Sequence, residues 1–400
     1  MRNDGGYMTD FPPFELPMNF AEREIHDLLI HCHRQGVSDI TISSDDRIWV
    51  KVRKTYAPVT ARLIGAVEVE LILSILYGAT GYGILSSGEA LDWSVTAKVS
   101  RDEVLYFRGN ATPTRVAGVD KGIQITLRPI PGIPPRLAEL GIEPEIIDNL
   151  FPAYGLVAVV GTTGSGKSTL IAAANRERLE AHTDRPVKII TFEDPIEFPL
   201  NGITESMPQP SQVEIGRGRH LNSFDQAGPN AMRRSADVIL MGEMRDRETV
   251  EVGFEMSMTG HAVYSTLHVD TPAEVFDRMV SYFPVDGQPA AANKLLSVSR
   301  MFVAQKLARG VDGKVRAFRS WLVMDREVRS RLGALPYDKW AQEARQIMRE
   351  RQTDFDAVVL KSYVEGHISA RVAMDVANLT RREFQAEIER LGVQYRAEAA

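Results

Sequence analysis

A glycine-rich stretch, GTTGSGKS at residues 161–168, has the residue types and spacing of a phosphate-binding loop. It lies between a run typical of a buried strand and a segment typical of a helix. In such a loop, backbone N–H groups turn toward the phosphates, a lysine reaches the β and γ phosphates, and a hydroxyl holds Mg²⁺. The stretch therefore predicts binding of ATP or GTP, with Ser168 as a magnesium ligand. The predicted nucleotide-binding residues are Gly161, Thr162, Thr163, Gly164, Ser165, Gly166, Lys167, Ser168 and Thr169.

Three carboxylates surround a proline in TFEDPIEFP, residues 191–199. Glu193, Asp194 and Glu197 follow an apolar run that predicts a strand. They are either solvated turn residues or charges held for a cation or a phosphate, and the stretch alone does not decide. The phosphate loop upstream gives Glu193 and Glu197 a target, whereas a turn role suits Asp194 better.

A second apolar strand runs directly into Glu243 in DVILMGEMRD, residues 237–246. Next to a phosphate loop, such a strand carries the acid that orients Mg²⁺ and its water in nucleotide hydrolases. The alternative is a surface acid at the start of a helix. The phosphate loop upstream favours the magnesium role.

Two histidines, His261 and His268, flank the strand in TGHAVYSTLH, residues 259–268. A histidine beside a γ-phosphate can donate a hydrogen bond and sense the phosphate, whereas a histidine at a strand end is more often structural. From the residues alone the two interpretations stand about even. The two histidines can also differ in role, one at the nucleotide and one supporting the acids.

The elements around these motifs predict an α/β protein of several domains. Short, continuously apolar strands alternate with helices beyond residue 137, which is typical of a parallel sheet covered on both faces. Upstream, the helical spacing of Ile25, Leu28, Leu29 and Cys32 and several alternating strands indicate a smaller α/β domain. The predicted boundaries are a flexible leader over 1–18, an N-terminal domain over 19–130, a linker over 131–136, an ATPase domain over 137–334 and a helical region over 335–400.

Composition excludes several classes of protein. Among 400 residues, 47 basic and 53 acidic side chains give a net charge of −6, which supplies no general attraction to nucleic acid or anionic lipid. We therefore expect no direct nucleic-acid partner. A single cysteine rules out an internal disulfide framework, and no run approaches the roughly 20 apolar residues that span a bilayer. A cytoplasmic protein is predicted. His31 and His33, two apart on a helix, point to opposite sides and do not predict a shared metal.

Taken in order, four motifs resemble the conserved boxes of the secretion and pilus ATPases, the superfamily of type II secretion, type IV pilus and type IV secretion motors. They are GTTGSGKS, TFEDPIEF, DVILMGEMRD and TGHAVYSTLH, with RMVSYFP at 278–284 as a further match. The resemblance runs from about residue 22 to about 378. GIQITLRPIPGIPPRLAELGIEPEI is most similar to the Dot/Icm type IVB secretion ATPases (DotB-like) and their counterparts in conjugative transfer.

This resemblance implies a hexameric ring of RecA-like P-loop ATPase domains with PAS-like N-terminal domains and C-terminal helices. It implies that Glu193 activates the attacking water and that Glu243 holds Mg²⁺ through water, with the reverse assignment left open. His261 and His268 belong to its histidine box. Arginines from the next subunit's N-terminal domain are expected to stabilise the transition state, and Arg108, Arg115 and Arg128 lie in the matching segment. Arg233 matches an arginine just before the Walker B strand.

The function predicted is hydrolysis of ATP with Mg²⁺ by a homohexamer that powers a cell-envelope secretion, conjugation or pilus machine. Such a protein attaches to the inner membrane through partners. The rival is a RecA-like nucleic-acid motor, a helicase or packaging ATPase, which predicts stimulation by DNA or RNA. A third class is a nucleotide-gated adaptor with negligible turnover.

Overall fold

The computed structural model describes residues 11–52, 55–100, 103–116, 119–130, 132–181, 186–203, 208–216 and 219–390. They form two compact units. Unit 1 holds the chain up to Ile133 together with two later segments, and unit 2 holds the rest. The change from one unit to the other falls at Ile133 and Pro134, within the predicted linker. The two later segments, Glu193–Pro199 and Val213–Ser223, lie inside the range predicted for the ATPase domain but pack with unit 1.

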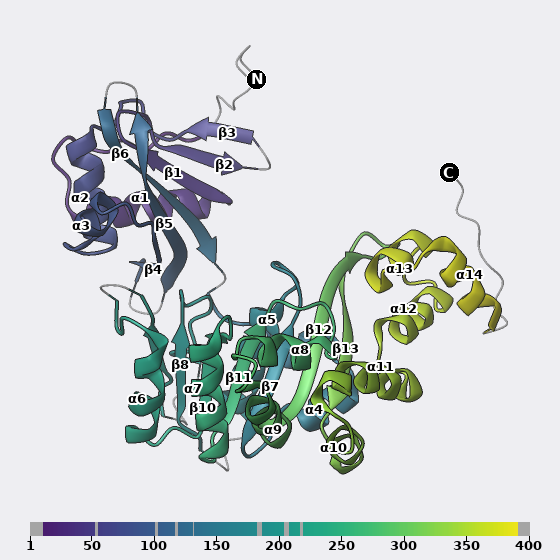
Figure 1. Ribbon diagram of the computed structural model, residues 1–400. Coiled ribbons are helices and arrows are strands. Elements are labelled where there is room, and N and C mark those ends of the chain that lie inside the picture. Colours follow the sequence, from purple (N-terminus) through teal and green to yellow (C-terminus); the bar gives the residue numbers. More distant parts are fainter. Residues whose placement is uncertain are drawn as a thin grey trace. The chain divides into compact units, whose positions relative to one another are not determined.

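Unit 1 is a six-stranded antiparallel sheet in the order β3-β2-β1-β6-β5-β4, with three helices packed against it (Figure 1). Its strands are β1 (Asp39–Ser43), β2 (Trp49–Val52), β3 (Thr55–Pro58), β4 (Leu91–Lys98), β5 (Val104–Val116) and β6 (Val119–Ile130). Its helices are α1 (Glu22–Arg34), α2 (Ala66–Leu76) and α3 (Gly81–Ser86).

The N-terminal part of unit 1 is anchored by apolar side chains. The predicted face of α1 is confirmed, because Ile25, Leu28, Leu29 and Cys32 are all fully buried. Residues 1–18 were predicted to be a flexible leader, but in the described part of that range Phe11 and Leu16 are buried in the same core. Residues 1–10 of that leader lie outside the described residues. Apolar contact with the core outweighs the local proline and glycine content that suggested flexibility.

Polar contacts within unit 1 explain why it gains the later segments. The buried Glu214 carboxylate accepts hydrogen bonds from Ser94 N at 2.6 Å and Ser94 Oγ at 3.2 Å. Arg219 neutralises that carboxylate at 2.5 Å and lies over the ring of Tyr77. A buried charge needs such partners. Partners more than a hundred residues apart carry no local sequence signal, so the sequence did not predict this arrangement.

Unit 2 is built on a seven-stranded sheet in the order β13-β12-β7-β11-β10-β8-β9. The strands β12, β7, β11, β10 and β8 run parallel, and β13 is antiparallel to β12. The parallel sheet predicted from the apolar runs is confirmed, and every residue of β7, β8 and β11 is buried. The bounds are β7 (Gly155–Val160), β8 (Ile189–Glu193), β9 (Ser211–Glu214), β10 (Val238–Glu243), β11 (Ala262–Leu267), β12 (Ser299–Arg309) and β13 (Val315–Val323).

Helices connect and cover these strands, and the last ones gather beside β13 (Figure 1). The connecting helices are η1 (Leu137–Leu140), α4 (Pro144–Asn149), α5 (Lys167–Ala181), η2 (Phe224–Gln226), α6 (Ala227–Arg233), α7 (Arg247–Met258), α8 (Glu274–Ser281) and α9 (Gln288–Val298). The C-terminal helices are α10 (Arg326–Gly333), η3 (Tyr337–Lys339), α11 (Trp340–Arg351), α12 (Phe355–Val364), α13 (Ala370–Ala377) and α14 (Arg381–Arg390). Within the described ranges, no helix is both long enough and apolar enough to cross a membrane.

Candidate active site

The phosphate-loop motif lies between the end of β7 and the start of α5 in unit 2. Three of its glycines have positive φ angles, +142° at Gly161, +79° at Gly164 and +85° at Gly166, so the backbone takes turns that other residues resist. The ammonium of Lys167 donates to the carbonyl oxygens of Gly161 at 2.8 Å and Thr162 at 3.0 Å. The lysine charge is therefore held over the loop, and the loop leads into the N-terminus of a 15-residue helix.

The neighbouring strands bring further predicted residues to the same edge of the sheet. Because β7, β11 and β10 are adjacent and parallel, their carboxyl ends coincide. Gly161 N donates to Leu267 O at 3.3 Å, which joins the first residue of the loop to the last residue of β11. His268 follows directly. Glu243 ends β10, the next strand.

Glu243 is held by an irregularity in its strand. Between Met241 and Glu243, the pairing of β10 with β11 shifts by one residue, so that Gly242 is extra. Thr266 Oγ1 donates to Gly242 O at 2.7 Å and fixes this bulge. Bulges redirect the side chains around them. The Glu243 carboxylate lies 3.6 Å from Nε2 of His268, and both side chains remain accessible to solvent.

His261 does not join this group. It precedes β11, and Ala262 pairs with Gly155 at the amino end of β7, so His261 lies at the opposite edge of the sheet from the loop. The six residues of β11 at about 3.3 Å each separate the two histidines by roughly 20 Å. His261 O instead accepts from Gly155 N, and its Nδ1 lies 3.0 Å from Met256 O. The prediction of a catalytic His261 is therefore corrected: its contacts are structural.

Glu193 ends β8, which pairs with β10 up to Phe192 and Met241. Its side chain is buried, and its carbonyl oxygen accepts from Ile215 N at 2.7 Å. From Glu193 the chain passes into unit 1. There Glu197 forms an ion pair with Arg108 at 3.4 Å, so a supporting role for Glu197 at the nucleotide competes with this partner.

The predicted arginines of the N-terminal domain lie on neighbouring strands of unit 1. Arg108 and Arg128 are paired across β5 and β6. Arg128 donates from Nε and Nη2 to one oxygen of Asp39, at 2.9 Å and 2.8 Å, although two thirds of its side chain is exposed. Arg115 is exposed on β5. Arg233, at the end of α6 in unit 2, is exposed as well.

Two hollows of unit 2 flank the phosphate loop and contain residues to which the sequence analysis gave no site role. One, of about 680 Å³, places Asp270, Glu274 and Arg278 opposite Thr162, Thr163 and His268. The other, of about 430 Å³, lies between the loop, β12 and α13 and is lined by Lys306 and Asp375 among others. Arg278 opens the RMVSYFP motif, which was the available signal for the first hollow.

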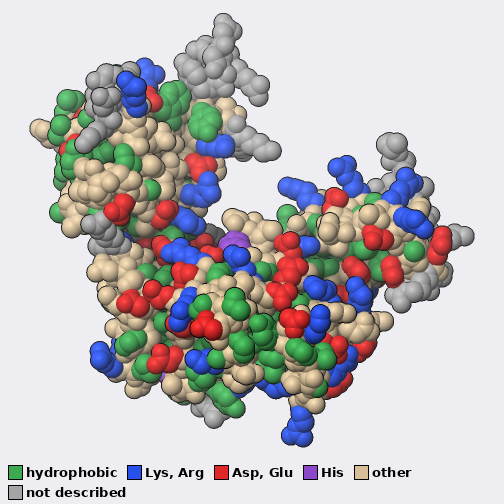
Figure 2. Space-filling view, in the orientation of Figure 1, with side chains coloured by type: hydrophobic (Ala, Val, Ile, Leu, Met, Phe, Trp, Pro, Cys, Tyr) green, Lys and Arg blue, Asp and Glu red, His purple; other side chains and the backbone are tan. Residues whose placement is uncertain are grey.

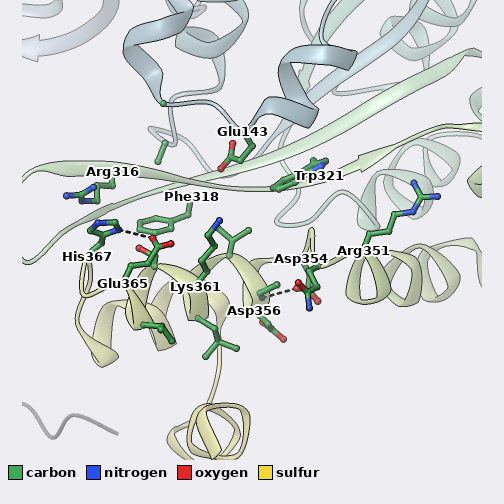
Figure 3. Close-up of a pocket in the computed structure, with 18 of the residues that line it drawn as sticks. Glu143, Arg316, Phe318, Trp321, Arg351, Asp354, Asp356, Lys361, Glu365 and His367 are labelled. Atoms are coloured by element: carbon green, nitrogen blue, oxygen red, sulfur yellow. Dashed lines mark hydrogen bonds and ion pairs between the residues drawn. The ribbon is translucent and has the colours of Figure 1, made fainter. Parts of the chain in front are cut away.

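A larger cavity of about 1230 Å³ lies elsewhere in unit 2, between η1, β13, α11 and α12. In Figure 3, Lys361 of α12 points toward β13, which carries Phe318 and Trp321, and Glu143 lies on the far side of that strand. None of the predicted site residues lines it. The motif residues at the sheet edge therefore lie apart from this cavity.

Comparisons with known proteins agree with the motifs. Residues 19–394 match the family model described as type II/IV secretion system protein. The type IV pilus retraction ATPase PilT of Pseudomonas aeruginosa is 28% identical over 295 residues, which cover 72% of this chain and 79% of PilT.

Two solved structures match almost the whole chain. The Legionella pneumophila ATPase DotB is 34% identical, with a TM-score of 0.84 over 91% of this chain and 98% of DotB. The pilus retraction motor PilT with bound ADP is 26% identical, with a TM-score of 0.75 over 92% of this chain and 99% of PilT. Unit 2 thus has the RecA-like fold of these ATPases, and the chain belongs to the type II/IV secretion system protein family and is an ATPase.

Proposed function

We propose that the chain is a homohexameric Mg-ATP motor that powers a type IV secretion machine of the IVB class. Its cytoplasmic subunits would attach to the inner membrane through other proteins of that machine. The observation that carries the proposal is the common sheet edge of the phosphate loop, His268 and Glu243, in a chain that matches DotB over 91% of its length. The IVB assignment rests on the DotB match together with the DotB-like segment at residues 122–146.

In the proposed site, residues 161–169 bind the phosphates and Lys167 neutralises the β and γ groups. Glu193 activates the attacking water, Glu243 orients the magnesium shell, and His268 hydrogen-bonds the γ-phosphate from beside Glu243. The reverse assignment of the two acids stays open. Arg115 and Arg128 of a neighbouring subunit stabilise the transition state, with Asp39 orienting Arg128.

Magnesium fits the donors available. A hydroxyl at Ser168 and a carboxylate at Glu243 are hard oxygen ligands, and the Glu243 side chain is accessible to solvent. No group of three or more His, Cys, Asp or Glu side chains suited to a metal occurs in the described part of the chain. Magnesium beside nucleotide phosphates needs only one or two protein oxygens. Bound there, the ion would offset phosphate charge.

Phosphate release by purified variants tests the site. We expect Lys167→Ala to weaken ATP binding by about a hundredfold and to abolish turnover, because a charge-assisted contact is lost. Lys294→Ala, an exposed lysine on α9, is the matched control. Glu193→Gln should bind ATP normally but lose turnover, whereas Glu243→Gln should raise the Mg²⁺ requirement. Wild-type turnover in Lys167→Ala would overturn the site.

Mixing inactive subunits tests the ring. If arginines act across subunits, Arg128→Ala and Lys167→Ala proteins are each inactive alone but regain part of the activity when co-assembled. Light scattering should give a hexamer for both. Absence of any recovery in verified mixed hexamers would exclude the proposed role of Arg128 in a neighbour's site.

The nucleic-acid motor is tested by adding DNA or RNA to the same assay. On the face of unit 2 drawn in Figure 2, acidic and basic side chains are interspersed, without the continuous basic band that favours binding to a phosphate backbone. We expect no stimulation. Affinity capture from the native cell should recover envelope proteins, and recovery of only nucleic-acid-processing proteins would favour the rival.

A further inference from the structure

A buried glutamine on the strand next to the phosphate loop contacts that loop directly. β12 runs parallel to β7, with Ala304 paired with Val160, so Gln305 lies beside the residue that opens the loop. Its side chain is buried, and its Nε2 donates to Ser165 O at 2.7 Å. This bond spans 140 residues of sequence and lies within unit 2.

Arg319 fixes the orientation of this amide. It stands opposite Gln305 in the β12–β13 pair, and its Nε donates to Gln305 Oε1 at 2.8 Å. Because a guanidinium has donors only, the amide must turn its oxygen toward Arg319 and its NH₂ toward the loop. Arg319 is itself held by Leu140 O at 2.9 Å, Gly141 O at 3.1 Å and Glu143 Oε2 at 3.2 Å.

The loop is packed against Gln305 with no spare room. A β-carbon at Gly161 would lie 2.5 Å from Gln305 O, and one at Gly166 would lie 2.7 Å from Gln305 Nε2. Real β-carbons essentially never make contacts this short, so Gly161, which meets backbone, requires glycine for space as well as for its positive φ angle. A β-carbon at position 166 would instead push the Gln305 amide away from the loop. Gln305 and the phosphate loop are therefore in direct packing contact.

The bond to Ser165 O has a consequence for anion binding. In a trans peptide the C=O and the following N–H point in opposite directions. When Gln305 holds the Ser165 carbonyl, the N–H of Gly166 points away from β12, to the side where a phosphate loop needs its donors. Without the hydrogen bond from Gln305, the peptide between Ser165 and Gly166 could rotate and turn its carbonyl dipole toward the phosphates.

We infer that Gln305 is a positioning residue for nucleotide binding: its amide, oriented by Arg319, aims the backbone donors of the phosphate loop. The inference rests on the proposed placement of the phosphates at residues 161–169. It extends the site to the antiparallel strand β13, which contributes no residue to the loop itself. It also assigns a function to two buried polar side chains, Gln305 and Arg319.

The test compares Gln305→Glu, Gln305→Met and the control Ser299→Ala by calorimetric titration with ADP and by thermal unfolding. Gln305→Glu keeps the acceptor for Arg319 but loses the donor to Ser165, so it should stay folded and bind ADP about tenfold more weakly. Gln305→Met loses the donor without adding charge and should also bind more weakly. Ser299→Ala removes a buried hydrogen bond of 2.6 Å from the same strand and should lower only the melting temperature.

Wild-type ADP affinity in folded Gln305→Glu would overturn the inference. So would a loss of ADP affinity in Ser299→Ala that matches the Gln305 variants at an equal loss of melting temperature, since the effect would then be general destabilisation. Lys167→Ala, measured in parallel, separates the two proposals. If it binds ADP as the wild type does, the phosphate site itself is wrong, whatever the Gln305 variants do.

Discussion

Replacing Arg319 by methionine should destabilise unit 2 strongly. The guanidinium is 1% exposed and donates to Gln305, Leu140, Gly141 and Glu143. Burial lowers the pKa of this guanidinium and the Glu143 carboxylate opposes that effect, but an arginine stays charged in either case. Methionine fills much of the same space and leaves four acceptors without their donor.

Breaking a buried charge pair by removing one partner costs about 3–5 kcal/mol. Glu143 is about one quarter exposed, so water can solvate its unpaired carboxylate, and we expect the low end, about 3 kcal/mol. For a domain of this size that lowers the melting temperature by about 6–12 °C. Arg319→Lys should be intermediate, because an ammonium cannot reach all four acceptors.

Urea and thermal unfolding measure the effect, with Arg316→Met as the matched control. Arg316 lies on the same strand and forms an exposed ion pair with Asp312 at 3.0 Å, which is expected to contribute less than about 1 kcal/mol. The buried contacts of Arg319 do not stabilise unit 2 as described if the free energy of unfolding of Arg319→Met is within about 1 kcal/mol of the wild-type value. The same conclusion follows if its melting temperature is no lower than that of Arg316→Met.

Two further predictions concern titratable groups. Burial, and then the nearby Asp354, raise the pKa of Asp356 on α12 from 3.8 to about 6 (Figure 3). The folded chain therefore binds this proton more tightly than the unfolded chain does. The stability that results is lost as pH rises from about 4 through about 6. This rise in pKa corresponds to about 3 kcal/mol before solvent screening and to about 1 kcal/mol for a half-buried group. In urea titrations, Asp356→Asn should therefore be about 1 kcal/mol more stable than the wild type at pH 8 and should lose this pH dependence. An equal gain in stability at pH 4 would contradict the prediction. Burial also raises the pKa of Cys32 to about 12. Because the thiolate is the nucleophile, Ellman's reagent should label the folded protein about a thousandfold more slowly than the urea-unfolded protein. Rapid labelling of the folded state would contradict the burial of α1 against its sheet.

The parallel half of unit 2 could be predicted because its signals are local. The apolar run VKIITF and the helix KSTLIAAANRERLEA correspond to β8 and α5, and the loop motif needs only its own glycines, lysine and serine. Glu243 and His268 were predicted as site residues because they lie at the carboxyl ends of predicted strands, and parallel strands bring such ends together. The same rule misled for His261, because a residue that precedes a strand lies at the other edge of the sheet.

The residues that support the loop gave no comparable signal. Gln305 and Arg319 lie in strands that the sequence analysis did not identify, and a glutamine or arginine in a strand usually faces water. The two side chains meet because the register of β12 against β13 places Gln305 opposite Arg319. A slip of one residue would place Phe318 or Ser320 opposite Gln305, with no guanidinium to orient its amide. The register of β12 against β13, far from the phosphate loop in sequence, therefore brings a guanidinium to the glutamine that contacts the Ser165 carbonyl of that loop.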